Sequence, residues 1–251
     1  MRGLWPLLKK EVREQWRTYR LLIVGSLFLM FGITTPLTLK YLPQILESAG
    51  EGMTIEVPPP TAAQSLAEYA GTIAQVGVLV VVLVGMGCVA NELRSGTAVM
   101  TLSKPVGRGA FVGAKLMAMS LTFLVSMAVA SAFCFAYTVW LIEDAGVMAF
   151  VELNLLLGLF LVFCLAVTLL LSSLFKSSLA AGGIALSVLL GQALLGAVPY
   201  IGHFMPNKIL GWGNSLLTGG GESYWGALAV TVAAIGLCTF AAQRSLKLRD
   251  L

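Results

Sequence analysis

Few side chains in this sequence have the chemistry of a catalytic or metal-binding site. His203 is the single histidine, which argues against a histidine-based metal cluster and against a serine–histidine nucleophile pair. Cys88, Cys134, Cys164 and Cys238 all lie in apolar stretches and form no C-x-x-C pair, so we expect core thiols. No phosphate-binding G-x-x-x-x-G-K-[ST] loop occurs. We therefore predict no catalytic residue, no metal ligand and no cofactor on this chain.

Polar residues inside apolar stretches are the remaining candidates, because polar groups are costly in hydrocarbon. Thr34, Thr35, Gln75 and Gln192 could line a substrate path, with helix packing as the alternative that we favour. Pro36 follows the two threonines, and we expect their hydroxyls to satisfy carbonyls freed by a kink. No carboxylate lies at mid-depth, which disfavours a proton-driven carrier.

The composition places these residues in a membrane protein. Hydrophobic residues make up 58% of the 251, and charged residues only 11%. Six continuous apolar runs are long enough to cross about 30 Å of hydrocarbon as helices: 21–39, 70–90, 116–142, 153–175, 179–201 and 225–242. We predict an all-α polytopic fold in one transmembrane domain, with an N-terminal helix in 1–20, a six-span bundle in 21–242 and a tail in 243–251.

The scarce charges predict the orientation. The segments before the first span, between spans two and three, between spans four and five, and after the sixth carry 14 of the 16 Lys and Arg residues. Eight of the 12 acidic residues lie on the other side. Since basic loops stay in the cytoplasm, we expect a multi-pass plasma-membrane protein with both termini cytoplasmic. The net charge of +4 is small, and we expect no nucleic-acid partner.

The first twenty residues are typical of an amphipathic helix in the cytoplasmic interface. Trp5, Leu8, Val12, Trp16 and Tyr19 recur at spacings of three and four, which places them on one face, and we expect Lys and Arg to cover the rest. The helix is either a general membrane anchor that contacts lipid or an elbow that docks against a partner.

Two outer segments are expected to lack regular structure. The acidic loop 41–68 contains three consecutive prolines from Pro58 and is interpreted as a stiff spacer, with a small ordered element as the alternative. The loop 202–224 contains Gly219-Gly220-Gly221, which favours a flexible turn.

The cytoplasmic loop after the second span is the most informative. Thr97 can cap a short helix over residues 98–103, and Lys104-Pro105 would end it. Val99 and Leu102 give that helix a small apolar face. The segment could insert into a groove on a soluble partner, or it could be a simple connector.

Together these features resemble the type-2 ABC transporter permeases, in the subgroup associated with multicopper-enzyme maturation. The matching residues are Lys10-Glu11-Val12-Arg13 and Arg17, then Glu92, Ser95-Gly96-Thr97, Leu102-Ser103-Lys104-Pro105-Val106, Arg108, Phe111 and Lys115.

The resemblance implies an elbow helix, six spans and a coupling helix between spans two and three. It implies two permease subunits, identical or different, and separate ABC ATPase subunits that hold ATP and Mg. ATPase coupling would fall to Glu92, Gly96, Thr97, Leu102, Lys104, Pro105 and Arg108, and the elbow residues would be Lys10, Glu11, Arg13 and Arg17.

Two hypotheses of function follow. The first is the permease subunit of an ATP-driven exporter that couples hydrolysis on another chain to translocation. The alternative is a membrane anchor or assembly factor that recruits a cytoplasmic partner without moving cargo, motivated by the absence of a charged site within the spans.

Overall fold

The computed structural model describes residues 4–49, 59–97, 107–221 and 223–248, and within these ranges the chain is helical with no strand. Six of the described helices are long and apolar enough to cross a membrane, which confirms the predicted six-span fold. The chain runs through α1 (Leu4–Arg17), α2 (Arg20–Ala49), α3 (Ala62–Gly85), α4 (Ala90–Arg94), α6 (Arg108–Leu141), α7 (Val147–Leu174), α8 (Ser178–Leu195), η1 (Gly202–Phe204), α9 (Lys208–Leu217) and α10 (Trp225–Leu248).

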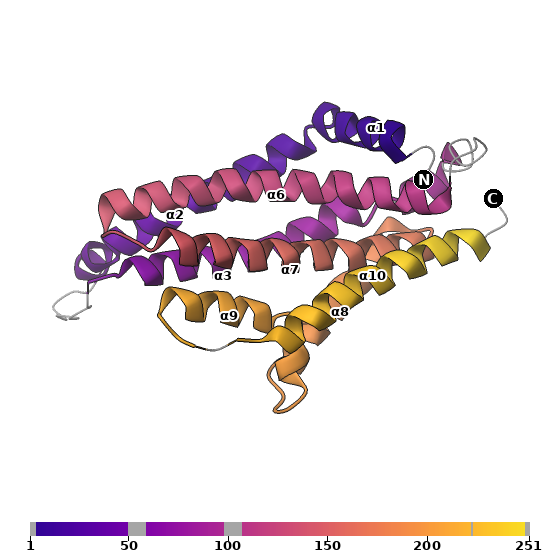
Figure 1. Cartoon of the computed structure of the whole chain (residues 1–251). Coiled ribbons are helices and arrows are strands. Elements are labelled where there is room, and N and C mark those ends of the chain that lie inside the picture. The colour runs from indigo at the N-terminus through magenta and orange to yellow at the C-terminus, as the bar shows by residue number, and fades with distance from the viewer. Residues whose placement is uncertain (1–3, 50–58, 98–106, 222, 249–251) are drawn as a thin grey trace.

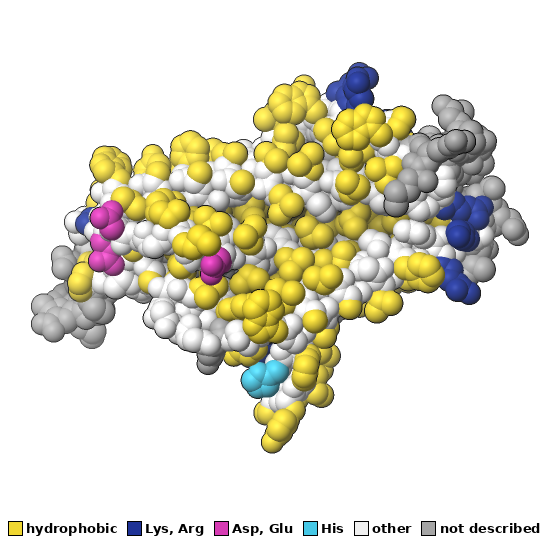
Figure 2. Space-filling view, in the orientation of Figure 1, with side chains coloured by type: hydrophobic (Ala, Val, Ile, Leu, Met, Phe, Trp, Pro, Cys, Tyr) yellow, Lys and Arg dark blue, Asp and Glu magenta, His cyan; other side chains and the backbone are white. Residues whose placement is uncertain are grey.

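Helix α7 is the centre of the bundle. It contacts α3, α6, α8, α9 and α10, and about two thirds of its most apolar window is buried. In the outer helices α8 and α10, only about a fifth of the most apolar window is buried, and wide apolar faces stay exposed. Figure 1 shows α1 and the C-terminal end of α10 toward the same end of the bundle. Figure 2 shows basic side chains gathered at that end and acidic ones mostly toward the other, on the face drawn.

Short polar signals set several helix boundaries. The Thr61 side chain accepts a hydrogen bond from the Gln64 amide and caps α3, and the Ser177 side chain caps α8 in the same way through Ala180. The Ser177 cap makes the α7–α8 connection a tight hairpin. Between α1 and α2, Tyr19 adopts a positive φ of 56°, a conformation that few non-glycine residues take, and the chain turns there.

The outer loop 41–68 is shorter than predicted. Helix α2 continues through Pro43 to Ala49 and α3 begins at Ala62, so Glu68 lies in a helix. A helix of 30 residues is about 45 Å long and exceeds the hydrocarbon thickness, so its end can carry polar residues into the interface. The spacer assigned to Pro58 lies largely outside the described residues.

The loop 202–224 contains a helix that the sequence did not predict. Helix α9 buries Ile209 and Gly213, one turn apart, against α7, and a Cβ on Gly213 would lie 3.1 Å from Leu153. Gly219 has a φ of +73°, and the Gly220 amide donates to the Ser215 carbonyl. This arrangement is a Schellman cap, so these two glycines end a helix and the prediction of a flexible turn was wrong.

The threonines before Pro36 do not act as predicted. Pro36 leaves the Gly32 carbonyl without its amide donor, because that carbonyl lies four residues earlier. The hydroxyls of Thr34 and Thr35 donate instead to the carbonyls of Met30 and Phe31. A side-chain hydroxyl in a helix most easily reaches the carbonyl four residues back, which places both hydroxyls before the freed carbonyl.

Gly32 sets the approach of α2 to α6. A Cβ at this position would lie 2.6 Å from the carbonyl oxygen of Ala130. Both the glycine and the oxygen belong to backbone, so neither can move without shifting a whole helix. Only glycine allows the two helices to meet at this distance.

We expect Gly32→Ala to lower stability by about 1–3 kcal/mol, because the added methyl group forces α2 away from α6. Thermal unfolding of the detergent-purified chain measures the loss. The matched control is Gly71→Ala in α3, where a Cβ meets nothing within 4 Å. An equal melting temperature for the two variants would contradict the close approach.

Candidate functional site

The face of α1 that packs on the bundle carries two polar residues, and the aromatic residues lie on another face. Leu7, Glu11 and Gln15 recur every four residues and are buried. The aromatic stripe forms only in part: Trp5 and Trp16 are exposed on α1, whereas Tyr19 lies beyond the end of the helix. The prediction that basic residues cover the rest of the helix was wrong, since this third stripe packs on α6. Of the predicted elbow residues, Lys10, Arg13 and Arg17 are exposed and only Glu11 is buried.

The polar stripe meets a buried lysine of α6. The Lys115 ammonium donates to both carboxylate oxygens of Glu11 at 3.1 Å and to Oε1 of Glu92 at 2.8 Å. Lys115 is only 2% exposed, and its Nζ also lies 5.2 Å from the centroid of the Phe111 ring, one turn earlier. The ammonium therefore joins three elements, α1, α4 and α6, that are distant in sequence.

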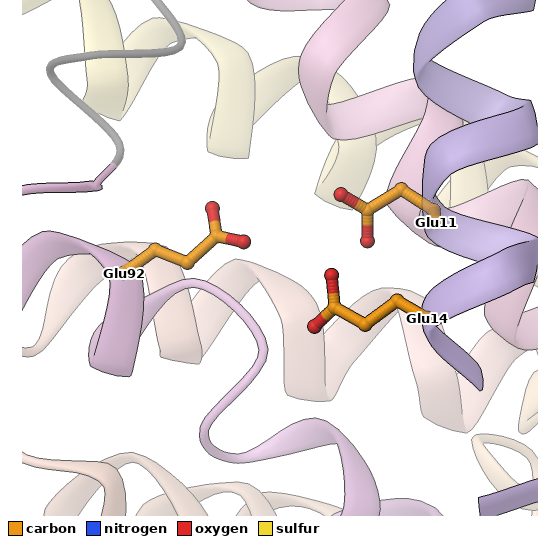
Figure 3. Close-up of side chains that lie close together, drawn as sticks. All are labelled: Glu11, Glu14 and Glu92. Carbon is orange, nitrogen blue, oxygen red and sulfur yellow. The ribbon is translucent and has the colours of Figure 1, made fainter. Parts of the chain in front are cut away.

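A third carboxylate completes the cluster. Figure 3 shows Glu11, Glu14 and Glu92 directed toward one another, from α1 and α4. One oxygen of each lies within 4.8 Å of the others, a spacing that a cation could bridge. The Lys115 ammonium, bonded to two of the three acids, already supplies positive charge there. The arrangement can hold helices together electrostatically, but it offers neither a nucleophile nor a proton relay to a substrate.

Helix α4 is fixed at its start by α7. The chain breaks its helix after Gly85, and Ser172 of α7 fills the break: its hydroxyl accepts from the amides of Val89 and Ala90 and donates to the Met86 carbonyl. Ser172 is fully buried, so these bonds satisfy backbone groups that water does not reach. One side chain thus holds the junction between α3 and α4.

A second contact ties α4 to α8. Ser178, in the first turn of α8, donates to Oδ1 of Asn91 at 2.5 Å. A Cβ on Gly87 would lie 2.5 Å from the Asn91 side chain, which would have to shift. Helix α4 therefore touches α7 and α8 through its first residues, and α1 and α6 through Glu92.

The residues after α4 fold back on it. Gly96 has a φ of +74°, the left-handed conformation common after a helix end, and the hydroxyls of Ser95 and Thr97 lie 2.9 Å apart. The Thr97 hydroxyl donates to the Glu92 carbonyl. The predicted helix over residues 98–103, with Leu102, Lys104 and Pro105, lies outside the described residues.

The other predicted residues lie apart from the cluster. Arg108 donates to the Lys247 carbonyl near the end of α10. Thr34 and Thr35 bond within α2, Gln75 is exposed on α3, and Gln192 on α8 holds a buried Oε1 without a partner among the described residues. No hydrogen bond joins any two of these four candidate path residues in the part of the chain that the structure describes.

Glu14 and Ser172 are not among the predicted site residues, and Lys115 entered only through the family resemblance, without a role. The distribution of the acidic residues along the sequence did point to this cluster. Only four of the 12 acidic residues lie on the predicted basic side of the membrane, and three of them form this cluster. Ser172 carried no such signal, because a serine near the end of an apolar run is ordinary.

Lys115→Met should destabilise the fold by about 3–5 kcal/mol, because it leaves Glu11 and Glu92 buried without a counterion. The triple variant with Glu11→Gln and Glu92→Gln should recover part of that loss. Thermal unfolding in detergent measures both, with Lys176→Met, at an exposed lysine, as the control. A single variant as stable as the control would show that the cluster contributes nothing.

Comparison with known proteins gives the family. The pattern shared by ABC-2 family transporter proteins matches residues 5–216, which include the whole cluster. The chain is also similar to the "Uncharacterized transmembrane protein YxlG" of Bacillus subtilis (strain 168), with 28% identity over 199 residues and 77% of each chain covered. The multicopper-associated subgroup is named by neither comparison and stays a prediction. The match over most of the chain and the six spanning helices agree: this protein is a multi-pass membrane protein that belongs to the ABC-2 transporter family.

Proposed function

We propose that this chain is the permease subunit of an exporter driven by separate ABC ATPase subunits, which hold the ATP and Mg. The observation that carries the proposal is the Glu11–Lys115–Glu92 cluster. It links the elbow helix α1, the third span α6 and the α4 segment that leads into the predicted coupling region.

The proposed transmission starts at α4. An ATPase that docks on residues 92–108 would push on a five-residue helix that is bonded at both ends. Ser172 passes the displacement to α7, and Glu92 passes it through Lys115 to α6 and α1. Because these bonds are buried, moving α4 alone would break them, and the neighbouring helices move with it instead. Gly96, Thr97, Leu102, Lys104, Pro105 and Arg108 keep their proposed roles as ATPase contacts.

The proposed orientation follows the charges. The end of the bundle that holds α1 and the end of α10 also carries most basic side chains, so we place it in the cytoplasm, with the whole chain forming one permease domain. The exposed Trp5 and Trp16 would enter the lipid interface beside Lys10, Arg13 and Arg17.

A second permease subunit is proposed to pack on α8 and α10. Their exposed apolar faces include Leu190 at 55% and Leu237 at 68%. In a bilayer these faces need no cover, but a translocation path between two subunits requires helices that are free on one side of each subunit. These are the least buried spans of the chain.

Glu92→Gln should leave the ATPase bound but lower its stimulation by this chain about fivefold or more, because the link from α4 to Lys115 loses its charge. The complex that co-purifies with the tagged chain is reconstituted in nanodiscs, and its ATP hydrolysis is compared with that of the ATPase alone. Glu14→Gln is the matched control, since Glu14 makes no ion pair with Lys115 among the described contacts. Full stimulation in the Glu92 variant would exclude the proposed route.

The same preparation separates the two hypotheses. A permease should bring an ATPase with it, whereas an anchor or assembly factor would bring a partner without ATP hydrolysis. Recovery of such a partner, with no ATPase in the complex, would favour the anchor.

Leu190→Cys in a Cys238→Ser background should form disulfide-linked pairs of subunits in native membranes treated with a mild oxidant, if α8 lies at a subunit interface between identical chains. The other three cysteines are buried and leave a clean background. Leu121→Cys on α6 is the control, with 50% exposure. Equal cross-linking at both positions would indicate random collision in the membrane, and cross-linking only at Leu121 would place the interface elsewhere.

A further inference from the structure

An apolar groove of about 820 Å³ lies between α6 and α7, away from the ion cluster. The rings of Phe135 and Phe150, which both line it, stack with their centroids 5.6 Å apart. At Gly158 the Leu124 side chain packs tightly on α7, since a Cβ there would lie 2.8 Å from it. Of the lining side chains, only those of Ser131 and Asn154 are polar. Figure 2 shows hydrophobic side chains spread over the face on which α6 and α7 lie.

The groove has the depth of one membrane leaflet. Helix α7 has 28 residues, so it is about 42 Å long and extends about 6 Å beyond each side of a centred hydrocarbon layer of about 30 Å. The lining runs from Val147, the first residue of α7, to Val162, about 22 Å further along the axis. It therefore reaches from the interface at the end away from α1 to about the bilayer midplane. A lipid acyl chain in that leaflet covers the same depth.

Asn154 lines this groove and carries an unmatched acceptor, Oδ1, that is covered by its neighbours. Its Nδ2 donates to the Phe150 carbonyl at 2.8 Å, which fixes the amide orientation because the two oxygens would otherwise face each other. Its Oδ1 is buried and has no hydrogen-bond partner among the described residues. Asn154 lies about 10 Å from the start of α7, about 4 Å inside the hydrocarbon boundary, near the depth of lipid glycerol and ester groups. An unmatched carbonyl is costly at that depth, so the site favours a ligand with a donor there.

We propose that this groove binds a membrane lipid, with one acyl chain between α6 and α7 and a hydroxyl donor at its glycerol end bonded to Oδ1 of Asn154. The rim agrees with access from the bilayer, since Val147, Val151 and Leu155 are 61%, 45% and 69% exposed. The unpaired acceptor also favours a ligand with a hydroxyl group. A saturated hydrocarbon would fill the groove but leave Oδ1 of Asn154 without a hydrogen-bond donor. The proposal does not depend on transport or on an ATPase partner.

A matched pair of photoactivatable probes tests it. One is a diacylglycerol with a diazirine on an acyl chain and a free hydroxyl, and the other is the same molecule with that hydroxyl methylated. The full chain is reconstituted in phosphatidylcholine nanodiscs, irradiated, and mapped by mass spectrometry. We expect adducts concentrated on residues that line the groove, with the alcohol exceeding the ether about two- to tenfold, the range of one net hydrogen bond.

Two variants separate the apolar and polar contributions. Asn154→Leu should make the two probes label the groove equally. Ala128→Trp should abolish groove labelling by both, because Ala128 lines the groove and is exposed. Ala233→Trp, at an exposed alanine of α10 outside the lining, is the control and should label as the wild type does. Gel filtration checks that each variant is folded. If Ala128→Trp does not fold, the comparison of the two probes on Asn154→Leu still tests the proposal.

Three outcomes would overturn the proposal. Adducts spread evenly over all exposed helix faces would mean that lipid shows no preference for the groove. Equal labelling by alcohol and ether in the wild type would remove the role of Asn154. Disulfide formation between copies carrying Leu155→Cys, together with loss of labelling, would make the groove an interface between subunits.

Discussion

A lysine buried at one end of an apolar bundle is the constraint on which the arrangement of the other helices at that end depends. An unpaired ammonium in a low-dielectric surrounding is so costly that the fold must bring acids to it. Lys115 lies in α6, and the acids come from α1 and α4, the two short helices at the same end. The amphipathic helix is therefore held on the bundle by charge as well as by its leucines. A general membrane anchor would not need a buried carboxylate on its inner face.

The same end contains the interruption of the second span. If the helix continued through residues 85–90, the direction of α3 would fix the position of Glu92. The break allows α4 to point in a different direction from α3. Ser172 stabilises this break, because its hydroxyl forms hydrogen bonds with three backbone groups that have no partner within the helix. Non-helical backbone at this depth is found where a neighbouring helix covers it, and α7 supplies that cover.

The two ends of the molecule differ in the kind of interaction they use. One end concentrates ion pairs around α4, whereas the other packs apolar surfaces and adds neutral hydrogen bonds, such as the one between the Ser65 and Thr138 hydroxyls. Helix α9 belongs to the second kind, since it lies against α7 through Ile209 and a glycine. Gly32 sets the spacing of α2 from α6, and Gly158 makes room for the Leu124 side chain beside the groove between α6 and α7.

The sequence by itself determined the six spans, because the length and hydropathy of a spanning helix are local properties. Glu11, Glu92 and Lys115 could be singled out only through a family resemblance. Only the tertiary structure showed that the three meet, since a contact between residues 104 apart has no periodic signature. It also showed which face of α1 packs on the bundle: the face with Glu11 and Gln15 is buried, while Trp5 and Trp16 stay exposed, where a lipid environment accepts apolar side chains. The polar face packs inward because Glu11 must lie beside the buried ammonium of Lys115.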